Sequence, residues 1–528
     1  MKRSSLRVLY GLAILLGLAA AALYSAHAPS RSPGLSVATW HNDNARTGWN
    51  PRESILTPAN VNAAQFGKRF SYPVDGVVFA QPLYLQNVDL PGRGALNVVF
   101  VATEHDTVYA FDADGKVREP LWKISFLNAG ATPVPQADVG STIFPEIGIT
   151  STPVLDPLAG TLYVVAVTKE GGDYVQRLHA LDIATGQERG GSPVVIRASV
   201  PGTGMGSAHG TLRFDPKIQL QRAALLLANH RIYIAWASHG DNGDYHGWIM
   251  AFDAASLRPA GVWNTTPNSF QGGIWMSGGG LSADASGFIY GIAGNGRFDL
   301  PAGGTSYSDT FFKPVPDLTE VQDWFAPFNQ QALAAVDTDL GSAAALLLPD
   351  QPGPHPHLMT SAGKEGRIYL LDRDHLGHFH AGGDTQIVQS LPQALGAAPA
   401  YFSYSSPAYW NGWVYFAGAD DALKAFRLTQ GRLATPPLQS ANTYPFPGAT
   451  PAVSSTGEGS AIVWTIAVGT DALYAHDAAN VAKELYDSNQ NAARDALGHA
   501  VSFSVPTVAN GRVYVGTTKA LVVYGVME

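Results

Sequence analysis

The sequence predicts an all-β fold, an eight-bladed β-propeller built from four-stranded antiparallel blades. Three observations predict this fold. One five-residue pattern recurs along the chain: a large apolar residue, any residue, a small or apolar residue, another apolar residue and, in most copies, Asp. The 56 Gly and 35 Pro residues suit many short strands joined by tight turns. Only 14% of residues are charged, a composition that fits short strands better than long helices.

The pentad defines the repeat from which the blades are built. Its copies are VYAFD (108–112), LHALD (178–182), IMAFD (249–253), LAAVD (333–337), IYLLD (368–372), LKAFR (423–427), LYAHD (473–477) and LVVYG (521–525). An alternating strand such as VVFVATE (98–104) precedes several copies, and a turn with Asp and Gly often follows. Such a unit is one antiparallel blade. Radial closure covers both faces of every blade, and eight related pentads therefore favour a propeller over two unrelated sandwiches.

The end of the chain determines how the ring closes. The eighth pentad leaves no room for a fourth strand, so we predict that FGKRFSYPV (66–74) supplies it. We expect an N-terminal extension over residues 29–65 and a single propeller over residues 66–528. The spacing from Asp253 to Asp337 is 84 residues, against 70 and 71 between the preceding copies, which predicts an insertion in blade four near 296–328. Long loops on a rigid scaffold often carry function.

The first 28 residues have the pattern of a signal peptide. Three cations among the first seven residues precede an apolar run from 8 to 23, and Ala26–Ala28 has the small-x-small form of a cleavage site. Pro29 follows directly and disfavours cleavage. An uncleaved anchor over residues 8–24 is therefore the alternative, since about 17 apolar residues are enough to span a membrane. Either case predicts export, to the periplasm or cell envelope.

Composition excludes several classes of function. A net charge of −9 without a basic stripe argues against nucleic-acid binding. The absence of cysteine excludes disulfides, thiolate metal sites and a cysteine nucleophile. There is no phosphate-binding loop and no Gly-x-Ser-x-Gly elbow. The histidine runs PHPH (354–357) and HLGHFH (375–380) do not have the spacing of a zinc site.

One repeat carries a family resemblance. ALDIATG (180–186) has the AxDxxTG form of the repeat signature of pyrroloquinoline quinone (PQQ) dehydrogenases and their non-enzymatic propeller relatives. The chain most resembles exported PQQ-like repeat proteins, over nearly all of its length after about residue 37, with phrases such as WHNDNARTGWN (40–50) and ATEHDTVYAFDADG (102–115). The resemblance implies a quinoprotein-dehydrogenase-like propeller, although the tryptophan that normally follows the signature is mostly missing.

The resemblance also implies positions for a cofactor site. It places Trp275 under the quinone, Asn295 on a calcium ion, Asp323 as the base and Lys364 against the quinone. For the carboxylate ligand of the metal, the stretch SHGDNGDYHGW (238–248) offers Asp241, Asn242 or Asp244, and we take Asp241 as the candidate. Each residue also has a structural explanation: core packing for the tryptophan, a left-handed turn for the asparagine, and solvated or loop-stabilising turns for the charged residues.

Two functions of different classes remain. The first is a non-catalytic cell-envelope propeller that binds a protein, glycan or small molecule on its loop face, with membrane contact only through the N-terminal segment. The second is a PQQ- and calcium-dependent dehydrogenase that oxidises an alcohol, sugar or aldehyde, with Asp323 as the proton acceptor. The sequence favours the first, because the acidic metal ligand has no clean match and fold alone does not define function. The second requires Trp275, Asn295, Asp323 and Lys364 to converge on the central channel.

Overall fold

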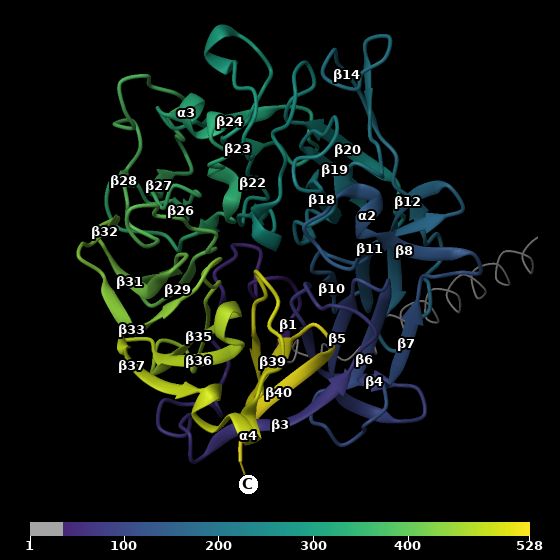
Figure 1. Cartoon of the computed structure of the whole chain (residues 1–528), viewed down its shortest axis with the longest axis vertical. Helices are drawn as coiled ribbons and strands as arrows, with labels where there is room; N and C mark the ends of the chain where they lie inside the picture. The colour runs from purple at the N-terminus through teal and green to yellow at the C-terminus, as the bar shows by residue number, and fades with distance from the viewer. Residues whose placement is uncertain (1–34, 528) are drawn as a thin grey trace, which may run out of the picture. The chain divides into compact units, whose positions relative to one another are not determined.

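Strands dominate the part of the chain that the computed structural model describes, residues 35–527. They form eight sheets of four to six strands arranged radially, and one separate two-stranded hairpin (Figure 1). The predicted eight-bladed propeller is therefore confirmed. The expected signal peptide or anchor, residues 1–28, lies outside the described residues. Among the residues described, no helix is long and apolar enough to span a membrane.

The first four blades follow one another along the chain. Blade one contains β1 (Ser36–Val37), β4 (Leu83–Leu90), β5 (Gly94–Thr103), β6 (Thr107–Asp112) and β7 (Trp122–Ser125). Blade two contains β8 (Ala131–Pro135), β9 (Glu146–Ile147), β10 (Val154–Asp156), β11 (Thr161–Glu170), β12 (Asp173–Asp182) and β13 (Val194–Val195), and the hairpin β14 (Ser199–Pro201) and β15 (Thr211–Arg213) follows it. Blade three contains β16 (Gln219–Leu220), β17 (Leu226–Ala228), β18 (Arg231–Ser238), β19 (Trp248–Asp253) and β20 (Pro259–Asn264). Blade four contains β21 (Ser282–Ala283), β22 (Ile289–Ile292), β23 (Phe311–Pro314) and β24 (Val321–Phe325).

The last four blades complete the ring. Blade five contains β25 (Leu346–Leu347), β26 (Leu358–Ala362), β27 (Ile368–Asp372) and β28 (Gln389–Leu391). Blade six contains β29 (Ala408–Trp410), β30 (Trp413–Ala417), β31 (Asp421–Thr429), β32 (Arg432–Leu433) and β33 (Leu438–Tyr444). Blade seven contains β2 (Trp49–Asn50), β34 (Ala452–Ser455), β35 (Ala461–Ala467), β36 (Ala472–Asp477) and β37 (Asn480–Asp487). Blade eight contains β38 (Thr507–Ala509), β39 (Arg512–Gly516), β40 (Ala520–Val526) and β3 (Phe66–Pro73).

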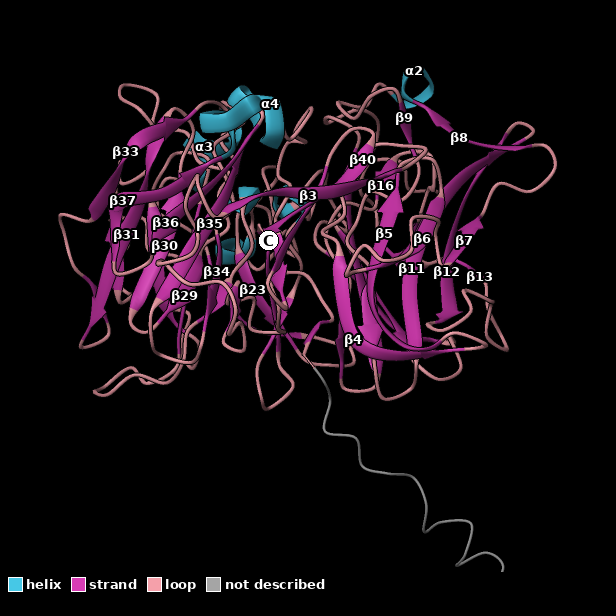
Figure 2. Ribbon diagram, turned by 90° about the horizontal axis from the view of Figure 1, so that it is seen from below, coloured by secondary structure: helices cyan, strands magenta, loops and turns pink. Residues whose placement is uncertain are grey.

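Short helices occupy the connections between strands. In the described part of the chain, the α-helices are α2 (Gln136–Val139), α3 (Gln330–Ala335) and α4 (Ala492–Asp495), and the 3-10 turns are η1 (Met276–Gly278), η2 (Leu300–Ala302), η3 (Leu340–Ser342), η4 (Val468–Thr470) and η5 (Ser488–Asn491). The helices α2, α3 and α4 lie on one face of the ring, the upper face in Figure 2.

The two ends of the propeller are joined in blade eight. β3 pairs antiparallel with β40, from Phe66 opposite Val526 to Pro73 opposite Ala520. In Figure 1 the purple β3 lies beside the yellow β40. The predicted closing strand is confirmed. Strands from both ends of the propeller thus complete the last blade, and β3 is its outermost strand.

One pentad was assigned to the wrong element. LAAVD (333–337) does not form a strand of blade four, because its first three residues end helix α3. The corresponding strand is β23, which pairs with β22 and β24. The interval 296–328, in which we expected an insertion, therefore contains two outer strands of blade four as well as loop residues. The additional residues of this repeat lie in two long connections, 293–310 between β22 and β23 and 326–345 between β24 and β25.

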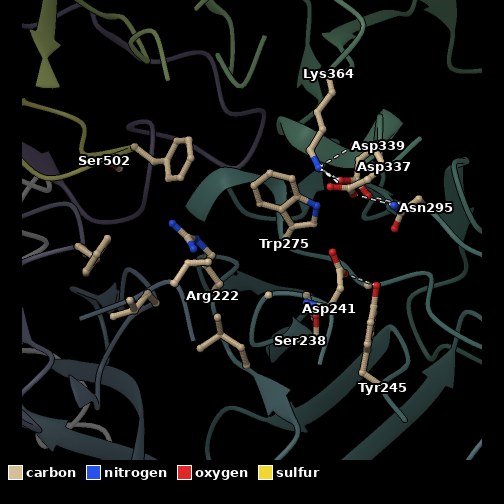
Figure 3. A pocket seen from close by; sticks show the side chains of 18 of the residues that line it. Arg222, Ser238, Asp241, Tyr245, Trp275, Asn295, Asp337, Asp339, Lys364 and Ser502 are labelled. Carbon is tan, nitrogen blue, oxygen red and sulfur yellow. Dashed lines mark hydrogen bonds and ion pairs between the residues drawn. The ribbon is translucent and has the colours of Figure 1, made fainter. Parts of the chain in front are cut away.

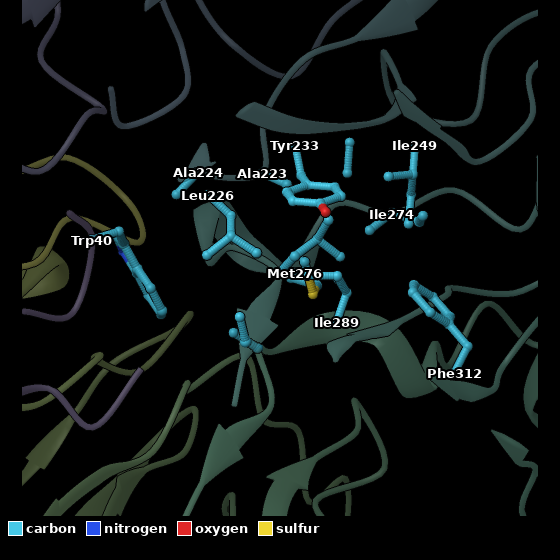
Figure 4. Packing of buried hydrophobic residues seen from close by; sticks show 14 of the residues in the cluster. Trp40, Ala223, Ala224, Leu226, Tyr233, Ile249, Ile274, Met276, Ile289 and Phe312 are labelled. Atoms are coloured by element: carbon cyan, nitrogen blue, oxygen red, sulfur yellow. The ribbon is translucent and has the colours of Figure 1, made fainter. Parts of the chain in front are cut away.

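The hydrophobic core is divided among the interfaces between blades. Each of eight main clusters of buried residues joins two consecutive blades, and the cluster between blades three and four includes Tyr233, Ile274, Ile289 and Phe312 (Figure 4). Trp40, from the N-terminal segment, packs into the same cluster. Every blade is thus stabilised by its neighbours, as the repeat pattern requires.

The ALDIATG turn shows how the repeat signature works physically. The carboxylate of Asp182 accepts hydrogen bonds from the backbone N–H groups of Ala184 and Thr185 at 3.0 Å, which fixes the turn. Gly186 has φ of +72°, and a Cβ there would lie 2.7 Å from the ring of Trp122 in blade one. Trp122 in turn donates to the carbonyl of Ile183 at 3.0 Å. The signature therefore joins adjacent blades.

The segment expected as an N-terminal extension belongs to the propeller unit from residue 35 onward. β1 pairs with β4 of blade one, and β2 pairs in parallel with β34 of blade seven. Between them the fully buried Arg46 donates to the carbonyls of Trp40, Leu225 and Leu281 and to the hydroxyl of Thr39. This segment links blades that are far apart in the sequence.

Candidate functional site

A cavity of about 410 Å³ lies on the axis of the propeller. Its lining comes from segments around most of the ring, which include Phe79, Ile143, Arg222, Asp241, Tyr245, Trp275, Asn295, Asp337, Asp339, Lys364, Phe446 and Phe503. Figure 3 shows Trp275 between Arg222 on one side and the group formed by Lys364 and its carboxylate partners on the other. The cavity thus combines an aromatic surface with charged groups at two ends.

Equivalent loops of three successive blades supply three of the polar side chains. Asp241 follows β18, Asn295 follows β22 and Lys364 follows β26, and each of these is the second strand of its blade. Strands in one blade alternate in direction, so all loops between second and third strands open on the same face. The repeat architecture itself therefore brings these three residues together.

Lys364 is the centre of a nearly buried ionic network. Its ammonium lies 2.5 Å from Asp339 Oδ2 and 3.1 Å from Asp337 Oδ1, and it lies 5.4 Å from the ring centre of Trp275. Burial disfavours the charged form of Lys364, but the charges of Asp339 and Asp337 outweigh it and raise its pKa. Burial raises the pKa of Asp339, and Lys364 partly offsets this effect. Lys364 therefore stays protonated and holds both carboxylates at the cavity.

Asn295 and Asp241 present oxygen atoms that the protein leaves free. The Asn295 amide nitrogen donates to Asp337 Oδ1 at 2.8 Å, and its backbone N–H donates to Asp339 Oδ1 at 2.7 Å. The Tyr245 hydroxyl donates to Asp241 Oδ1 at 2.5 Å. Within the described residues, no hydrogen bond reaches the amide oxygen of Asn295 or Oδ2 of Asp241. Hard oxygen donors of this kind suit calcium.

Arg222 forms the other charged end of the cavity. Its guanidinium lies 4.9 Å from the ring centre of Phe503 and 5.8 Å from that of Phe79, and only 8% of the residue is exposed. Arg222 forms neither a hydrogen bond nor an ion pair with any residue of the described chain. Burial lowers its pKa to about 10, so it remains a cation at neutral pH. A buried cation without hydrogen-bond partners fits an anionic ligand.

The structure brings together four of the five residues implied by the family resemblance. Trp275, Asn295, Lys364 and Asp241 all line the cavity. Asp323 does not, because it lies on β24, the outermost strand of blade four. Its carboxylate accepts a hydrogen bond from the backbone N–H of Leu376 at 2.8 Å and lies 3.1 Å from His378 Nε2. Asp323 therefore stabilises the contact between blades four and five, and its assignment as the base is corrected.

Sequence reasoning missed Asp337, Asp339 and Arg222. Asp337 ends the pentad that was taken for a strand, and the long spacing before it was the signal that this copy was irregular. In the structure Asp337 has φ of +54° and an exposed carboxylate (62%) beside Asn295. Arg222 has no recognisable motif. Only the closed ring places it against residues from other blades.

The described residues contain no group of three or more His, Cys, Asp or Glu side chains arranged to hold a metal ion. A cation bound between Asp241 and Asn295 would therefore need further oxygen atoms from a bound molecule to complete its coordination.

Comparison with known proteins identifies similarity of fold. No family model matches the chain, and no curated protein matches it in sequence. The structure resembles the quinohemoprotein alcohol dehydrogenase of Comamonas testosteroni (TM-score 0.62, 15% identity, 93% of this chain and 80% of that one). It also resembles the quinohemoprotein alcohol dehydrogenase ADHIIG of Pseudomonas putida HK5 (TM-score 0.61, 15% identity, 93% of this chain and 80% of that one). A third similar structure is a europium-containing methanol dehydrogenase (TM-score 0.61, 13% identity, 94% of this chain and 98% of that one). The chain has a quinoprotein-like propeller fold.

Proposed function

We propose that the axial cavity binds PQQ or a closely related quinone together with a hard cation, and that the protein is an oxidoreductase acting on an alcohol, sugar or aldehyde. The observation that carries the proposal is the convergence of Asp241, Asn295 and Lys364 from equivalent loops of blades three, four and five around Trp275. The fold that the chain shares with alcohol and methanol dehydrogenases supports the same proposal.

The residues present fit such a cofactor. PQQ is a flat molecule that carries carboxylates, and the cavity offers the partly exposed ring of Trp275 as a flat surface. Arg222 has free donors for a carboxylate, and Lys364 supplies a second cation. The oxygen atoms of Asp241 and Asn295 that accept no hydrogen bond would hold the cation. When bound, the quinone would supply a two-electron acceptor, which the protein itself lacks.

Asp337 is the side chain that can accept a proton from a substrate hydroxyl. It is exposed, and it accepts hydrogen bonds from Asn295 and Lys364. Asp339 is buried and accepts from the backbone N–H of Asn295 while it pairs with Lys364, so it positions the other two residues. The aromatic side chains Phe446 and Phe503 line the same cavity and add apolar surface beside the charged groups.

The test is cofactor binding followed by turnover. Purified protein is titrated with PQQ in the presence of Ca²⁺, or of Eu³⁺ because a structural neighbour contains europium, and tryptophan fluorescence reports binding. Dye reduction is then measured over a panel of alcohols, sugars and aldehydes. We expect saturable, cation-dependent quenching and turnover with at least one substrate class.

The other class of function is an outcome of the same test. Binding of PQQ without turnover on any substrate would leave a ligand-binding role. The absence of both binding and turnover would overturn the proposal and favour the non-catalytic envelope protein that the sequence suggested.

A further inference from the structure

Glu104 is a completely buried carboxylate near the cavity that the proposed reaction does not use. It lies directly after β5, in the loop between β5 and β6 of blade one, and none of its surface is exposed. Its Oε2 accepts hydrogen bonds from the backbone N–H of Gly148 at 2.8 Å and from the hydroxyl of Thr150 at 3.1 Å. Its Oε1 has no hydrogen-bond partner among residues 35–527. A buried carboxylate satisfied on one oxygen only favours its neutral, protonated form.

The charges around Glu104 reinforce this preference. Two carboxylates face it, those of Asp106 and Glu146. Asp106 is also fully buried. Neither of its carboxylate oxygens has a hydrogen-bond partner in the part of the chain that the structure describes, although the backbone N–H of Val167 faces it.

Other ionisable side chains nearby already have partners. The imidazole of His105 lies 2.8 Å from Glu146, and Lys123 lies 3.1 Å from Asp75. The cation that acts on Glu104 is Arg222, from blade three. Burial raises the pKa of Glu104 to about 7, while Gly148, Thr150 and Arg222 act in the opposite direction.

Arg222 connects Glu104 to the axial cavity. Thr150, which hydrogen-bonds Glu104, and Arg222 line one small void of about 10 Å³, close to the space that a single water molecule needs. Arg222 also lines the axial cavity, and the charge of Glu104 raises the pKa of its guanidinium. Glu104 therefore lies behind the cation that faces the ligand.

We propose that Glu104 sets the net charge that Arg222 presents to the cavity, so that binding of an anionic ligand takes up a proton on Glu104. The inference rests on the proposed function for the identity of the ligand, a carboxylate-bearing quinone. When Glu104 is neutral, Arg222 attracts the ligand carboxylate without competition. When Glu104 is ionised, it neutralises Arg222 and repels the anion. A bound anion in turn raises the proton affinity of Glu104, since linkage is reciprocal.

The experiment is calorimetric titration of PQQ into the protein with Ca²⁺ between pH 6 and 8.5. At each pH, two buffers of different ionisation enthalpy give the number of protons taken up. We expect the affinity of the wild type to fall above pH 7, by up to about tenfold per pH unit for one linked proton. Proton uptake should reach its maximum over the same range.

Two variants show which carboxylate takes up the proton when PQQ binds. In Glu104→Gln we expect binding to persist with an affinity that no longer falls above pH 7 and without the associated proton uptake. Glu146→Gln is the matched control, because this partly exposed carboxylate faces the same site and should retain most of the uptake. If Glu104→Gln keeps the proton uptake and pH dependence of the wild type, the inference is overturned while the proposed function stands.

A ligand-free measurement separates the two proposals. The protonated Glu104 carboxyl gives an infrared C=O band that disappears in Glu104→Gln, and its titration midpoint is followed in the wild type and in Arg222→Met. We expect the midpoint to rise by at least half a pH unit when the arginine charge is removed. If PQQ binds at no pH, the proposed function fails, but the infrared titration still tests the coupling between Glu104 and Arg222. A Glu104 midpoint that is the same in the wild type and in Arg222→Met overturns the inference.

Discussion

The ammonium of Lys364 lies 2.5 Å from the carboxylate of Asp339, and both side chains are nearly buried, with 11% and 7% exposed. Lys364 comes from the loop between β26 and β27, and Asp339 comes from the connection that enters blade five after α3. The pair therefore fixes that connection against the blade. It also holds Asp337 and Asn295 at the cavity through the hydrogen bonds that they share with it.

Replacement of Lys364 by Met should destabilise the fold strongly. The change leaves Asp339 buried without its cation, and removal of one partner of a buried pair typically costs about 3–5 kcal/mol. The free energy of unfolding in guanidinium chloride measures the effect. Lys116→Met is the matched control, because Lys116 pairs with Asp114 at the surface with 72% of its side chain exposed, and its loss should lower the free energy of unfolding far less. Equal losses in the two variants would contradict the buried network.

The two candidate bases should behave differently. Asp337→Asn keeps the shape of the side chain but removes the proton acceptor at the cavity, so turnover should fall by at least about 100-fold with little change in PQQ binding. Asp323→Asn should leave both within about twofold of the wild type, because Asp323 lies on the outermost strand of its blade. Steady-state kinetics together with fluorescence titration measure both. A larger loss of turnover in the Asp323 variant would restore the original assignment.

Trp275 should provide binding energy to a flat ligand. In Trp275→Ala the affinity for PQQ should fall by about tenfold or more, because a stacked aromatic pair contributes roughly 0.5–1.5 kcal/mol beyond the area it buries. Trp324→Ala is the control, since Trp324 lies on β24, beside Asp323, and contacts Phe298 and His378. Titration of both variants by calorimetry compares them, and equal affinities would remove Trp275 from the site.

The fold could be predicted because each repeat carries its own signal. Seven of the eight pentads form third strands of blades, where large apolar residues such as Tyr109 and Phe111 alternate with small ones. The closing strand followed from a count of strands. LAAVD was the exception, because Leu333, Ala334 and Ala335 also suit a short helix, and the pattern of five residues does not distinguish the two.

The site was predicted less completely than the fold. Asp241, Asn295 and Lys364 each stand two or three residues after the end of the strand that precedes them, so local motifs could locate them. The placement of Asp323 at the cavity was wrong. The residues around it resemble a family segment, but they form β24, the outermost strand of blade four. Arg222 needed the closed ring, because its aromatic partners Phe79 and Phe503 are more than 140 residues away in the sequence.

Arg46 should be important for stability although it lies outside the cavity. It donates four hydrogen bonds, two within the N-terminal segment, to Thr39 and Trp40, and two that join this segment to Leu225 and Leu281 of blades three and four. Burial lowers its pKa to about 10. Arg46→Met leaves three buried carbonyls without a donor and should cost about 3 kcal/mol or more. Arg118→Met, at an exposed position, should change the free energy of unfolding by about 0.5 kcal/mol or less. Thermal and guanidinium unfolding measure both variants, and similar stabilities would contradict this role.

Glu104 should make the stability of the protein depend on pH even without ligand. Its pKa rises from 4.5 to about 7 on folding, chiefly through burial, so the folded protein retains a proton that the unfolded chain releases. The free energy of unfolding should therefore fall as pH rises from about 4.5 to 7, by up to about 3 kcal/mol from this group, and the effect should level off above pH 7.

Guanidinium unfolding at pH 5, 6, 7 and 8 tests this, with Glu104→Gln compared to the wild type at each pH. The charge of Glu104 also raises the pKa of Asp106, so the difference between the two proteins reports Glu104 together with its effect on Asp106. Glu119→Gln, at an exposed position, should give a curve parallel to that of the wild type. A parallel curve for Glu104→Gln as well would mean that Glu104 binds no proton in the folded protein near pH 6, and the proton-coupled role of Arg222 would lose its basis.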